Sequence, residues 1–466
     1  MFKFYDDYEQ LLKEFKKHNI DGKNIIEKHL ELKLPIRSFS RPFMPGNGCI
    51  FELKQGVSKD IINMSNDICL AYSEKEILAI LNDMPIIKWY CGMNKGTLKN
   101  VAIIWRDHFL EENVGLLNGF LEMGVLPEDI IAFDKGDSTK HHIEIWKTFE
   151  KMGFTVDLLD NASFTDKKEI EIAKNKILNF INKRKDKKII VLDDGAIIST
   201  ILNDIKIDNV IGILELTEMG LRRIRNLETE PLYPILNIAK TSLKRNITYP
   251  EIANSIFLRI IDLLGAEKIV GRKVILCGYG DMGEILADRL QKYGVHVIIH
   301  DPDIMKLIIA SERGFQTYKD IEEATKKENP FMIIGASGYR SITKSVVESL
   351  DNNTYVTAGA TADLLVFEEL EKEGKLKKES ISNIGTHYLI NDKRITVLGN
   401  GRSVNLFNSE AIPNKSNDVF KVSMLVASVK LITGNQKIAK DICLEEVENW
   451  IRESGILNKY YDLYLK

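Results

Sequence analysis

Three glycines in the C-terminal half of the chain have the spacing of a phosphate-binding loop. Gly278, Gly280 and Gly283 form a G-x-G-x-x-G pattern between the apolar residues 274–277 and the amphipathic residues 284–293. The first glycine permits a tight turn, the second lets backbone approach a pyrophosphate, and the third lets a helix pack closely on a strand. The helix N-terminus adds unpaired N–H groups for the phosphates. This order predicts a dinucleotide-binding site.

An acidic residue lies where such a site needs one. Residues 295–299 form a second apolar stretch, which is followed by Asp301, at about the position where a carboxylate takes a ribose hydroxyl. The same charge would repel a 2′-phosphate, so the sequence favours NAD over NADP. For the glycines alone, the alternative is a glycine-rich turn in another kind of α/β protein.

The elements that must position these residues alternate between strands and helices. Apolar stretches typical of buried strands occupy residues 100–105, 130–133, 188–192, 209–214, 331–334 and 354–357. Helical patterns occupy 111–123, 142–152, 251–264, 341–350 and 418–432, and a hairpin is expected at 387–398 after a polar stretch at 369–382. Strands that alternate with helices indicate parallel sheets covered on both faces. The predicted fold class is α/β, with two Rossmann-like doubly wound domains, a substrate lobe and an NAD-binding lobe, and a C-terminal arm.

The chain of 466 residues is too long for one ordinary core, so several domains are expected. Residues 1–65 are expected to be an N-terminal appendage, and 66–245 a substrate-binding α/β domain that 412–440 completes. Residues 246–411 are expected to be the NAD-binding Rossmann domain. Residues 441–466 have no evident place in either core, so we expect an arm that serves oligomerisation.

The composition excludes several other classes of protein. With 44% hydrophobic and 28% charged residues and a net charge of −3, the chain is typical of a soluble globular protein. No charge cluster favours nucleic acid and no apolar run favours a membrane. The five scattered cysteines indicate reduced thiols and a cytoplasmic location. Histidines are dispersed, with the adjacent His141 and His142 expected at the surface, and no metal site is predicted.

Three motifs carry a resemblance to a known family. They are G-Y-G-D-x-G at residues 278–283 with the strand end at 297–303, G-R-x-V-N-L at 401–406, and L-D-D-G at 192–195. On these residues the chain resembles the S-adenosylhomocysteine hydrolase (adenosylhomocysteinase) family, as a diverged member, over roughly residues 66–434. The resemblance implies NAD as the cofactor and a homodimer or homotetramer as the assembly.

The resemblance also implies a reaction. In that family NAD transiently oxidises a ribose 3′-hydroxyl, and the ketone acidifies the neighbouring C4′–H. A base then removes that proton, the 5′-thiol leaves by elimination, water adds, and the ketone is reduced again. His and Asp side chains can move such a proton, and a Lys near the hydroxyl can stabilise an alkoxide.

The resemblance assigns roles residue by residue. His108, Asp194 and Lys244 correspond to catalytic residues, and Glu112 corresponds to an acid on the adenosine side. The remaining matches are expected at the cofactor, namely Asp281, Met282, Thr217 and Asn405. Each catalytic candidate also has a purely structural alternative. His108 and Asp194 are placed to cap the helices that follow them, and Lys244 lies in a loop rich in basic residues.

The chain departs from the family on the substrate side. Thr248 and Tyr249 stand where the family has Asp and Asn, and Thr361 stands where it has His, although Asp363 is retained. Ile412 replaces the His that reads the adenine. Thr248, Thr361 and Asp363 remain candidates for substrate contacts.

We therefore expect an NAD-dependent enzyme that transiently oxidises a ribosyl or polyol hydroxyl to drive elimination or hydrolysis. Its substrate is expected to be a nucleoside-like small molecule other than S-adenosylhomocysteine. Two alternatives stay open. One is true S-adenosylhomocysteine hydrolysis with altered adenine contacts, and the other is a non-catalytic, NAD-binding regulatory paralogue.

Overall fold

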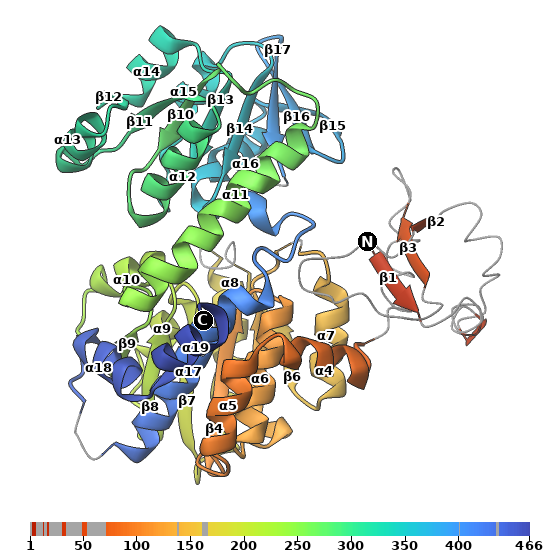
Figure 1. Ribbon diagram of the computed structural model, residues 1–466, viewed down its shortest axis with the longest axis vertical. Helices are drawn as coiled ribbons and strands as arrows, with labels where there is room; N and C mark the ends of the chain where they lie inside the picture. The colour runs from red at the N-terminus through yellow and green to blue at the C-terminus, as the bar shows by residue number, and fades with distance from the viewer. Residues whose placement is uncertain are drawn as a thin grey trace. The chain divides into compact units, whose positions relative to one another are not determined.

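The computed structural model describes residues 2–5, 13, 16–17, 30–33, 49–53, 71–137, 139–160, 166–399, 401–434 and 438–466. The chain divides into two compact units (Figure 1). The first comprises Met1–Ser242 and Ile412–Lys466, and the second comprises Leu243–Ala411. Within the expected N-terminal appendage, β1 (Phe2–Tyr5), β3 (Cys49–Leu53) and β2 (Leu30–Lys33) form an antiparallel sheet in that order. Most of residues 1–65 lie outside the described residues.

The first unit is built on a parallel sheet of seven strands in the order β18-β9-β8-β7-β4-β5-β6. These are β4 (Val101–Asp107), β5 (Ile130–Asp134), β6 (Thr155–Leu158), β7 (Lys188–Asp193), β8 (Val210–Glu215), β9 (Ile235–Asn237) and β18 (Ile442–Cys443). The chain runs outward from β4 to β6 and then returns to β7 on the other side of β4. This reversal is the topological switch point of a doubly wound sheet, and ligands bind beside it at the carboxyl ends of the strands.

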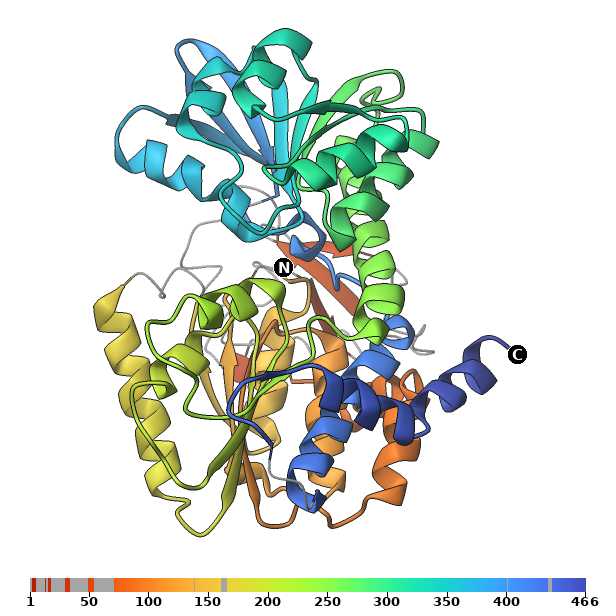
Figure 2. The same cartoon turned by 90° about the vertical axis from the view of Figure 1, so that its left-hand side faces the viewer.

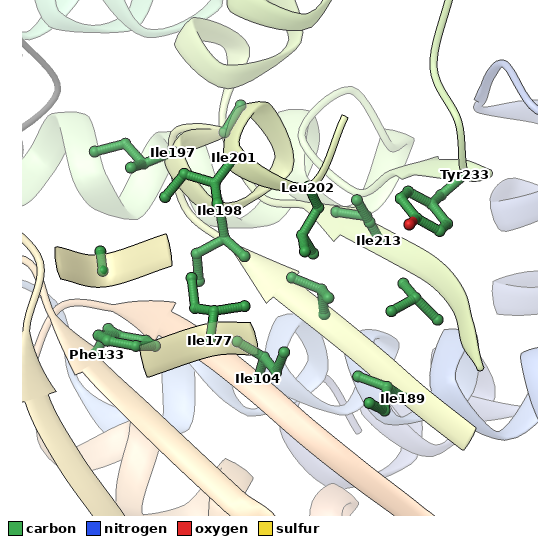
Figure 3. Packing of buried hydrophobic residues seen from close by; sticks show 14 of the residues in the cluster. Ile104, Phe133, Ile177, Ile189, Ile197, Ile198, Ile201, Leu202, Ile213 and Tyr233 are labelled. Carbon is green, nitrogen blue, oxygen red and sulfur yellow. The ribbon is translucent and has the colours of Figure 1, made fainter. Parts of the chain in front are cut away.

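Helices cover both faces of this sheet (Figure 1 and Figure 2). On one face lie α4 (Glu74–Asn82), α5 (Pro85–Met93), α6 (Glu111–Glu122), α7 (His142–Lys151) and α17 (Asn414–Thr433). On the other lie α8 (Lys167–Asn182), α9 (Ile197–Leu202) and α10 (Glu218–Arg225). On this second face Ile104 and Ile189 of the strands meet Ile177 of α8 and Ile198 of α9, as Figure 3 shows. Burial of these apolar side chains is the main force that holds the layers together.

The C-terminal residues are part of the first unit, which corrects the expectation that they have no place in a core. β18 pairs with β9, and α18 (Glu445–Glu453) and α19 (Ile456–Tyr464) pack on α17. Their apolar spacing supplies Val447, Ile451 and Ile456 to that core. A role of residues 441–466 in oligomerisation stays a prediction.

The second unit is built on an eight-stranded sheet in the order β12-β11-β10-β13-β14-β17-β16-β15. These are β10 (Lys273–Cys277), β11 (His296–His300), β12 (Gln316–Tyr318), β13 (Met332–Gly335), β14 (Thr354–Ala358), β15 (Lys377–Ile381), β16 (Gly385–Ile390) and β17 (Lys393–Leu398). The strands β12, β11, β10, β13, β14 and β17 run parallel to one another, and β16 and β15 extend the sheet with antiparallel pairing. The switch point lies between β10 and β13.

Two apolar cores lie on opposite faces of this second sheet. One face packs against α11 (Tyr249–Leu264), α12 (Asp281–Lys292) and α13 (Ile304–Glu312). The other packs against α14 (Ile321–Glu328), α15 (Lys344–Ser349) and α16 (Leu365–Lys372). Both units therefore have helices on both faces of a mainly parallel sheet, and the predicted fold class is confirmed.

The polar stretch at 369–382, for which the sequence predicts no element, contains regular structure. It holds the end of α16 and all of β15, whose side chains are exposed on the edge of the sheet. Charged side chains on an edge strand discourage pairing with other molecules, so polarity here does not mark a loop. In the described part of the chain no helix is long and apolar enough to cross a membrane.

Candidate active site and cofactor site

The switch point of the first unit gathers polar residues from three neighbouring strands. Each of the strands β4, β5 and β7 ends in an aspartate, and a second polar residue follows it at the start of the loop. These are the pairs Asp107–His108, Asp134–Lys135 and Asp193–Asp194. Because β7, β4 and β5 are adjacent and parallel, their first loop residues meet at one edge of the sheet. The sequence-predicted His108 and Asp194 are thus brought together.

His108 is held by its ring and by its backbone. Its Nδ1 lies 2.5 Å from Oδ2 of Asp137, and its N–H donates to Oδ1 of Asp107 at 2.7 Å. Asn113 donates to its carbonyl oxygen at 2.7 Å. The helix α6 begins after Leu110 and has no side-chain cap, so His108 does not cap it.

Asp194 does not cap the helix that follows it, although its position after the strand suggested that role. Its Oδ1 accepts a hydrogen bond from Nζ of Lys135 at 2.5 Å. The preceding Asp193 instead accepts from the N–H and the hydroxyl of Ser199, at 2.7 and 2.8 Å, and so supports the first turn of α9. Burial raises the pKa of Asp193, as expected for a carboxyl without water around it. Of the two adjacent acids, Asp193 builds the fold and Asp194 reaches the polar cluster.

Glu215, the last residue of β8, ties the neighbouring loops together. Its Oε1 accepts from the N–H of Gly195 at 3.1 Å and from the N–H and hydroxyl of Thr217, both at 2.8 Å. Complete burial raises the pKa of Glu215 well above the usual value. Thr217 also accepts from the N–H of Gly220 at 2.9 Å, so its hydroxyl caps α10. Thr217 lies in the first unit, and its predicted contact with the cofactor stays a prediction.

Glu112 lies in a buried polar group beside this cluster. Asn417 of α17 donates to its Oε1 at 2.9 Å, and its Oε2 is buried without a hydrogen-bond partner among the described residues. Burial raises the pKa of Glu112 to about 7, against the opposing attraction of Lys421. Lys421 itself donates to Oδ2 of Asp107 at 3.0 Å. Because its pKa lies at about 7, this carboxyl can be protonated or ionised at neutral pH. Its Oε2 can therefore donate a hydrogen bond to a ligand or accept one from it.

The adjacent histidines are less exposed than their sequence suggested. His141 is buried, with its ring 6.2 Å from that of Tyr72. His142 is partly exposed, and its Nε2 lies 3.3 Å from Oδ2 of Asp134. Both rings therefore pack within the first unit, because the predicted helix, α7, covers the sheet at this point and turns them toward it.

The cluster also contains the arrangement of atoms that a metal ion needs. Asp107, His108 and Asp194 each offer one ligand atom, and these atoms lie within 4.8 Å of one another. Lys135, however, places its ammonium beside two of them, 3.2 Å from Nε2 of His108. A fixed cation of the protein thus already balances these groups, and the absence of a metal site stays a prediction.

The glycine loop of the second unit has the shape that a dinucleotide requires. Gly278 has φ of +110°, and a β-carbon at Gly283 would stand 2.0 Å from the carbonyl oxygen of Gly278. At Gly280, by contrast, a β-carbon would meet nothing within 4 Å, so the space before the first turn of α12 is open. The loop lies at the switch point between β10 and β13, where N–H groups of the helix face this space. These features fit the pyrophosphate of NAD.

Asp301 follows β11 directly and is buried. Its Oδ2 accepts from the N–H of Tyr279 in the glycine loop at 2.7 Å, and its Oδ1 accepts from the N–H of Asp303 at 2.9 Å. The carboxylate therefore holds the glycine loop in place, in addition to its expected contact with a ribose hydroxyl. Asp281, at the start of α12, pairs with Arg245 at 3.1 Å.

Other predicted residues of the second unit have structural partners. The carboxyl of Asp363 accepts from the hydroxyl of Ser337 at 2.6 Å and from the N–H of Ser341 at 3.1 Å, which fixes the loop after β13. Asn405 is buried in η5 (Val404–Leu406) and accepts from the hydroxyl of Ser403 at 2.6 Å. Direct contacts of Asp363 with substrate and of Asn405 with cofactor stay predictions.

Lys244 and Thr248 bound a short π-helical turn, η3 (Lys244–Thr248), which leads into α11. Both are buried, and the hydroxyl of Thr248 has no hydrogen-bond partner among the described residues. Such turns are rare and are frequent at functional sites. Met282 packs toward Gly359, and Thr361 begins η4 (Thr361–Leu364). Lys244 lies in the second unit, whereas His108 and Asp194 lie in the first.

Sequence reasoning missed four members of the first cluster, which are Asp107, Lys135, Asp137 and Lys421. Asp107 could have been found because it ends a strand next to His108, and Lys135 because it follows the strand predicted at 130–133. Asp137 and Lys421 carry no such signal, since a loop and a distant helix bring them to the site.

A family model described as "S-adenosyl-L-homocysteine hydrolase, NAD binding domain" matches residues 258–411. The adenosylhomocysteinase of Thermoplasma volcanium is 24% identical over 282 residues, covering 57% of this chain and 66% of that protein. The adenosylhomocysteinase of Archaeoglobus fulgidus is 28% identical over 264 residues, covering 54% and 63%. The S-inosyl-L-homocysteine hydrolase of Methanocaldococcus jannaschii is 26% identical over 260 residues, covering 53% and 61%.

The chain thus spans a little less than two thirds of the length of these relatives. Among solved structures, a dipicolinate synthase chain from Bacillus halodurans aligns with a TM-score of 0.39 at 14% identity, covering 73% of this chain and 99% of that one. An NADPH-dependent glyoxylate/hydroxypyruvate reductase from Sinorhizobium meliloti aligns with a TM-score of 0.37 at 12% identity, covering 72% and 96%. Scores at this level carry no argument about function.

The family match covers the glycine loop, Asp301 and the second sheet, which are the parts whose geometry fits a dinucleotide. The relatives are enzymes named for hydrolysis of S-nucleosyl-homocysteines. The predicted resemblance and the predicted cofactor, NAD, are both confirmed. Residues 258–411 thus match the NAD-binding domain of the S-adenosylhomocysteine hydrolase family, and more than half of the chain resembles that family at low sequence identity.

Proposed function

We propose that this protein is an NAD-dependent enzyme that transiently oxidises a ribosyl hydroxyl to drive cleavage of a nucleoside-like thioether. The observation that supports the proposal most strongly is that His108 and Asp194 lie together at the switch point of the first unit, where both contact Lys135. The second unit supplies the cofactor site at its own switch point. NAD, when bound, supplies the means to take up a hydride from the sugar and to return it.

The side chains of the first unit suit the proton transfers that such a reaction needs. His108 is partly exposed, whereas its partners Asp137 and Asp194 are buried, so the imidazole is the member of the cluster most open to a ligand. Removal of C4′–H requires a base of this kind beside the sugar. Lys244, with its ammonium, suits the hydroxyl that becomes the ketone, because a cation stabilises a developing alkoxide.

We propose a substrate other than S-adenosylhomocysteine. Ile412, where the family has an adenine-reading His, is buried and cannot form a hydrogen bond with a base through its side chain. Glu112 has a buried carboxyl oxygen free to interact with a polar edge of the ligand. One relative is named for S-inosyl-L-homocysteine, so a nucleoside with a different base is the first candidate.

Assembly and location are proposed on separate grounds. Leu457, Tyr461 and Leu465 of the C-terminal segment are exposed and lie four residues apart, on one side of the helical stretch. This apolar stripe supports a homodimer or homotetramer, which light scattering would show as a mass of at least twice 53.1 kDa. The buried free thiols of Cys91, Cys277 and Cys443 suit the reducing cytoplasm.

The experiment that tests this function follows the absorbance near 340 nm of the purified holoenzyme. The panel contains S-adenosylhomocysteine, S-inosylhomocysteine, adenosine, inosine and other nucleoside 5′-thioethers. We expect at least one member to produce the band of reduced NAD, and we expect S-adenosylhomocysteine to be processed about 10²–10⁴-fold less efficiently than that member. Lys244→Ala should abolish the band, whereas Lys292→Ala, an exposed residue of α12, should leave it unchanged. No response to any member would favour the regulatory paralogue.

A further inference from the structure

Lys135 lies level with His108 on the neighbouring strand of the first sheet. The register of β4 and β5 pairs Asp107 with Asp134, so the residues that follow, His108 and Lys135, leave the sheet side by side. On the other side of β4, the strand β7 ends at Asp193, and Asp194 follows. The side chain of Lys135 therefore stands where the loops of three adjacent parallel strands begin.

Its ammonium contacts both residues that are the candidates for proton transfer in the proposed reaction. Nζ of Lys135 lies 2.5 Å from Oδ1 of Asp194 and 3.2 Å from Nε2 of His108. The side chain of Lys135 is only 5% exposed, and that of Asp194 is 9% exposed. A lysine in such a place loses much of its hydration, so these two contacts replace contacts with water.

We propose that Lys135 is a positioning residue that fixes the protonation state of His108, with one proton on Nδ1 and a lone pair on Nε2. This inference rests on the proposed function of His108 as the base. It adds a residue to the site and explains how an imidazole surrounded by carboxylates stays able to accept a proton.

The chemistry of the donors and acceptors dictates the tautomer. A lysine ammonium has three donors and no acceptor, so Nε2 of His108 must accept at this contact. At the opposite side of the ring, Nδ1 lies 2.5 Å from Oδ2 of Asp137, and a carboxylate there accepts. The ring is therefore neutral, with Nδ1–H pointing at Asp137. Its Nε2 lone pair accepts the longer of the two contacts of Lys135, 3.2 Å against 2.5 Å to Asp194, and becomes available to a substrate when Lys135 keeps its contact with Asp194 alone.

The charges around the ring show why the lysine is needed. The groups that act on His108 are Asp107, Asp134, Asp137, Asp194, Lys135 and Lys421. Lys421 is already paired with Asp107. Without Lys135, the ring would face the carboxylates of Asp137 and Asp194 with no ammonium between them, which favours a second proton on the ring. An imidazolium has no lone pair and cannot act as a base.

The test reads the ring nitrogens of His108 directly, by ¹⁵N nuclear magnetic resonance of the histidine-labelled holoenzyme at pH 7. His108→Gln identifies the signals by deleting them. In the unsubstituted protein we expect a protonated Nδ1 and an unprotonated Nε2. In Lys135→Met we expect both nitrogens to be protonated, and in Lys135→Arg, which keeps a cation and a donor, we expect the neutral state to return.

A matched control is Lys176→Met, which removes another lysine from an ion pair of the same unit, the pair of Lys176 with Asp157. It should leave the His108 signals unchanged. A neutral ring in Lys135→Met, or a protonated Nε2 in the unsubstituted protein, would overturn the proposal. The melting temperature of each variant shows that it is folded, and Lys135→Gln replaces Lys135→Met should the latter fail to fold.

The nitrogen signals need no turnover, so they decide this inference even if the proposed function fails. Where a panel compound reduces the bound NAD, a second readout is available. Lys135→Met should then lower the rate of the 340 nm change about 10²-fold with little change in the concentration for half-saturation, because a base is lost and not a binding contact. Equal losses in both quantities would contradict the positioning role.

Discussion

Gly283 of helix α12 lies so close to Gly278 that a β-carbon on Gly283 would stand 2.0 Å from the Gly278 carbonyl oxygen. The glycine loop and the helix are therefore in contact through backbone alone. At Gly280, two residues into the same loop, a β-carbon would enter open space. The three glycines of one motif thus have different structural roles, and substitutions at them should affect stability and cofactor binding differently.

Gly283→Ala should destabilise the fold and Gly280→Ala should not. The first forces a methyl group against backbone and should lower the free energy of unfolding by about 1–3 kcal/mol or more. The second should change it by less than about 0.5 kcal/mol, yet weaken NAD binding, since its methyl group fills the space in which a pyrophosphate would lie. Urea unfolding and NAD titration measure the two effects. Tight NAD binding by Gly280→Ala would contradict the location of the phosphates.

Asp301→Ala should weaken NAD binding by about 1–3 kcal/mol, the usual loss for a charged hydrogen bond. Because Asp301 also accepts from the N–H of Tyr279, part of that loss would come from a looser loop. Asp301→Asn keeps an acceptor for the loop and is the matched variant. It should bind NAD with an intermediate affinity and discriminate less against NADP. Unchanged discrimination in a titration with both cofactors would show that the carboxylate does not face the ribose.

The sequence predicted the architecture because its signals are local. Buried parallel strands are short apolar runs, and the glycine spacing at 278–283 marks one strand-to-helix turn on its own. The hairpin at 387–398 likewise turns at Asn391 and Asp392, which both adopt positive φ in the structure. Each of these features depends on neighbours within a few residues.

The candidate site could be predicted only in part, because its contacts are not local. Asp137 reaches His108 from 29 residues away, and Lys421 reaches Asp107 from 314 residues away. A single polar residue after a strand does not reveal which strand will lie beside it. The same limit explains residues 441–466, whose amphipathic pattern on its own predicts an arm. Its apolar face instead meets α17, which no nearby residue could indicate.

Glu112 should make stability depend on pH near neutrality. Its pKa of about 7 in the folded protein lies above the value of 4.5 for an exposed carboxyl. The folded state therefore binds the proton more tightly, so this contribution is full below pH 4.5 and is lost as the pH rises through 7. The loss should approach about 3 kcal/mol at high pH.

Glu112→Gln resembles the protonated carboxyl and should remove this part of the pH dependence. The variant should be more stable than the unsubstituted protein at about pH 8 and should show a flatter profile between about pH 5 and 8. Burial also raises the pKa of Asp418, to about 6, but that group is present in both proteins and cancels in the comparison. Urea unfolding across this range measures the effect. Parallel profiles would contradict the buried, neutral carboxyl.

Tyr464 should hold the C-terminal helix to the first unit. Its hydroxyl donates to Oδ2 of Asp418 at 3.0 Å, and the same carboxyl accepts from the N–H groups of Ile86 and Ile87 at the start of α5. Tyr464→Phe should therefore cost about 1 kcal/mol of the free energy of unfolding. Tyr461→Phe, the same change at an exposed position of α19, is the control and should cost less than about 0.5 kcal/mol. Equal effects would mean that the bond to Asp418 does not contribute.

The central claim is that a base of the first unit removes the proton next to a transiently oxidised ribosyl hydroxyl. The most direct measurement incubates the holoenzyme in deuterium oxide with S-inosylhomocysteine and the other nucleoside thioethers, and then determines deuterium at C4′ by mass spectrometry and nuclear magnetic resonance. We predict deuterium at C4′ of at least one compound, lost in His108→Gln and in Lys244→Ala. Absence of deuterium from every compound, in a protein that demonstrably holds NAD, would contradict the account.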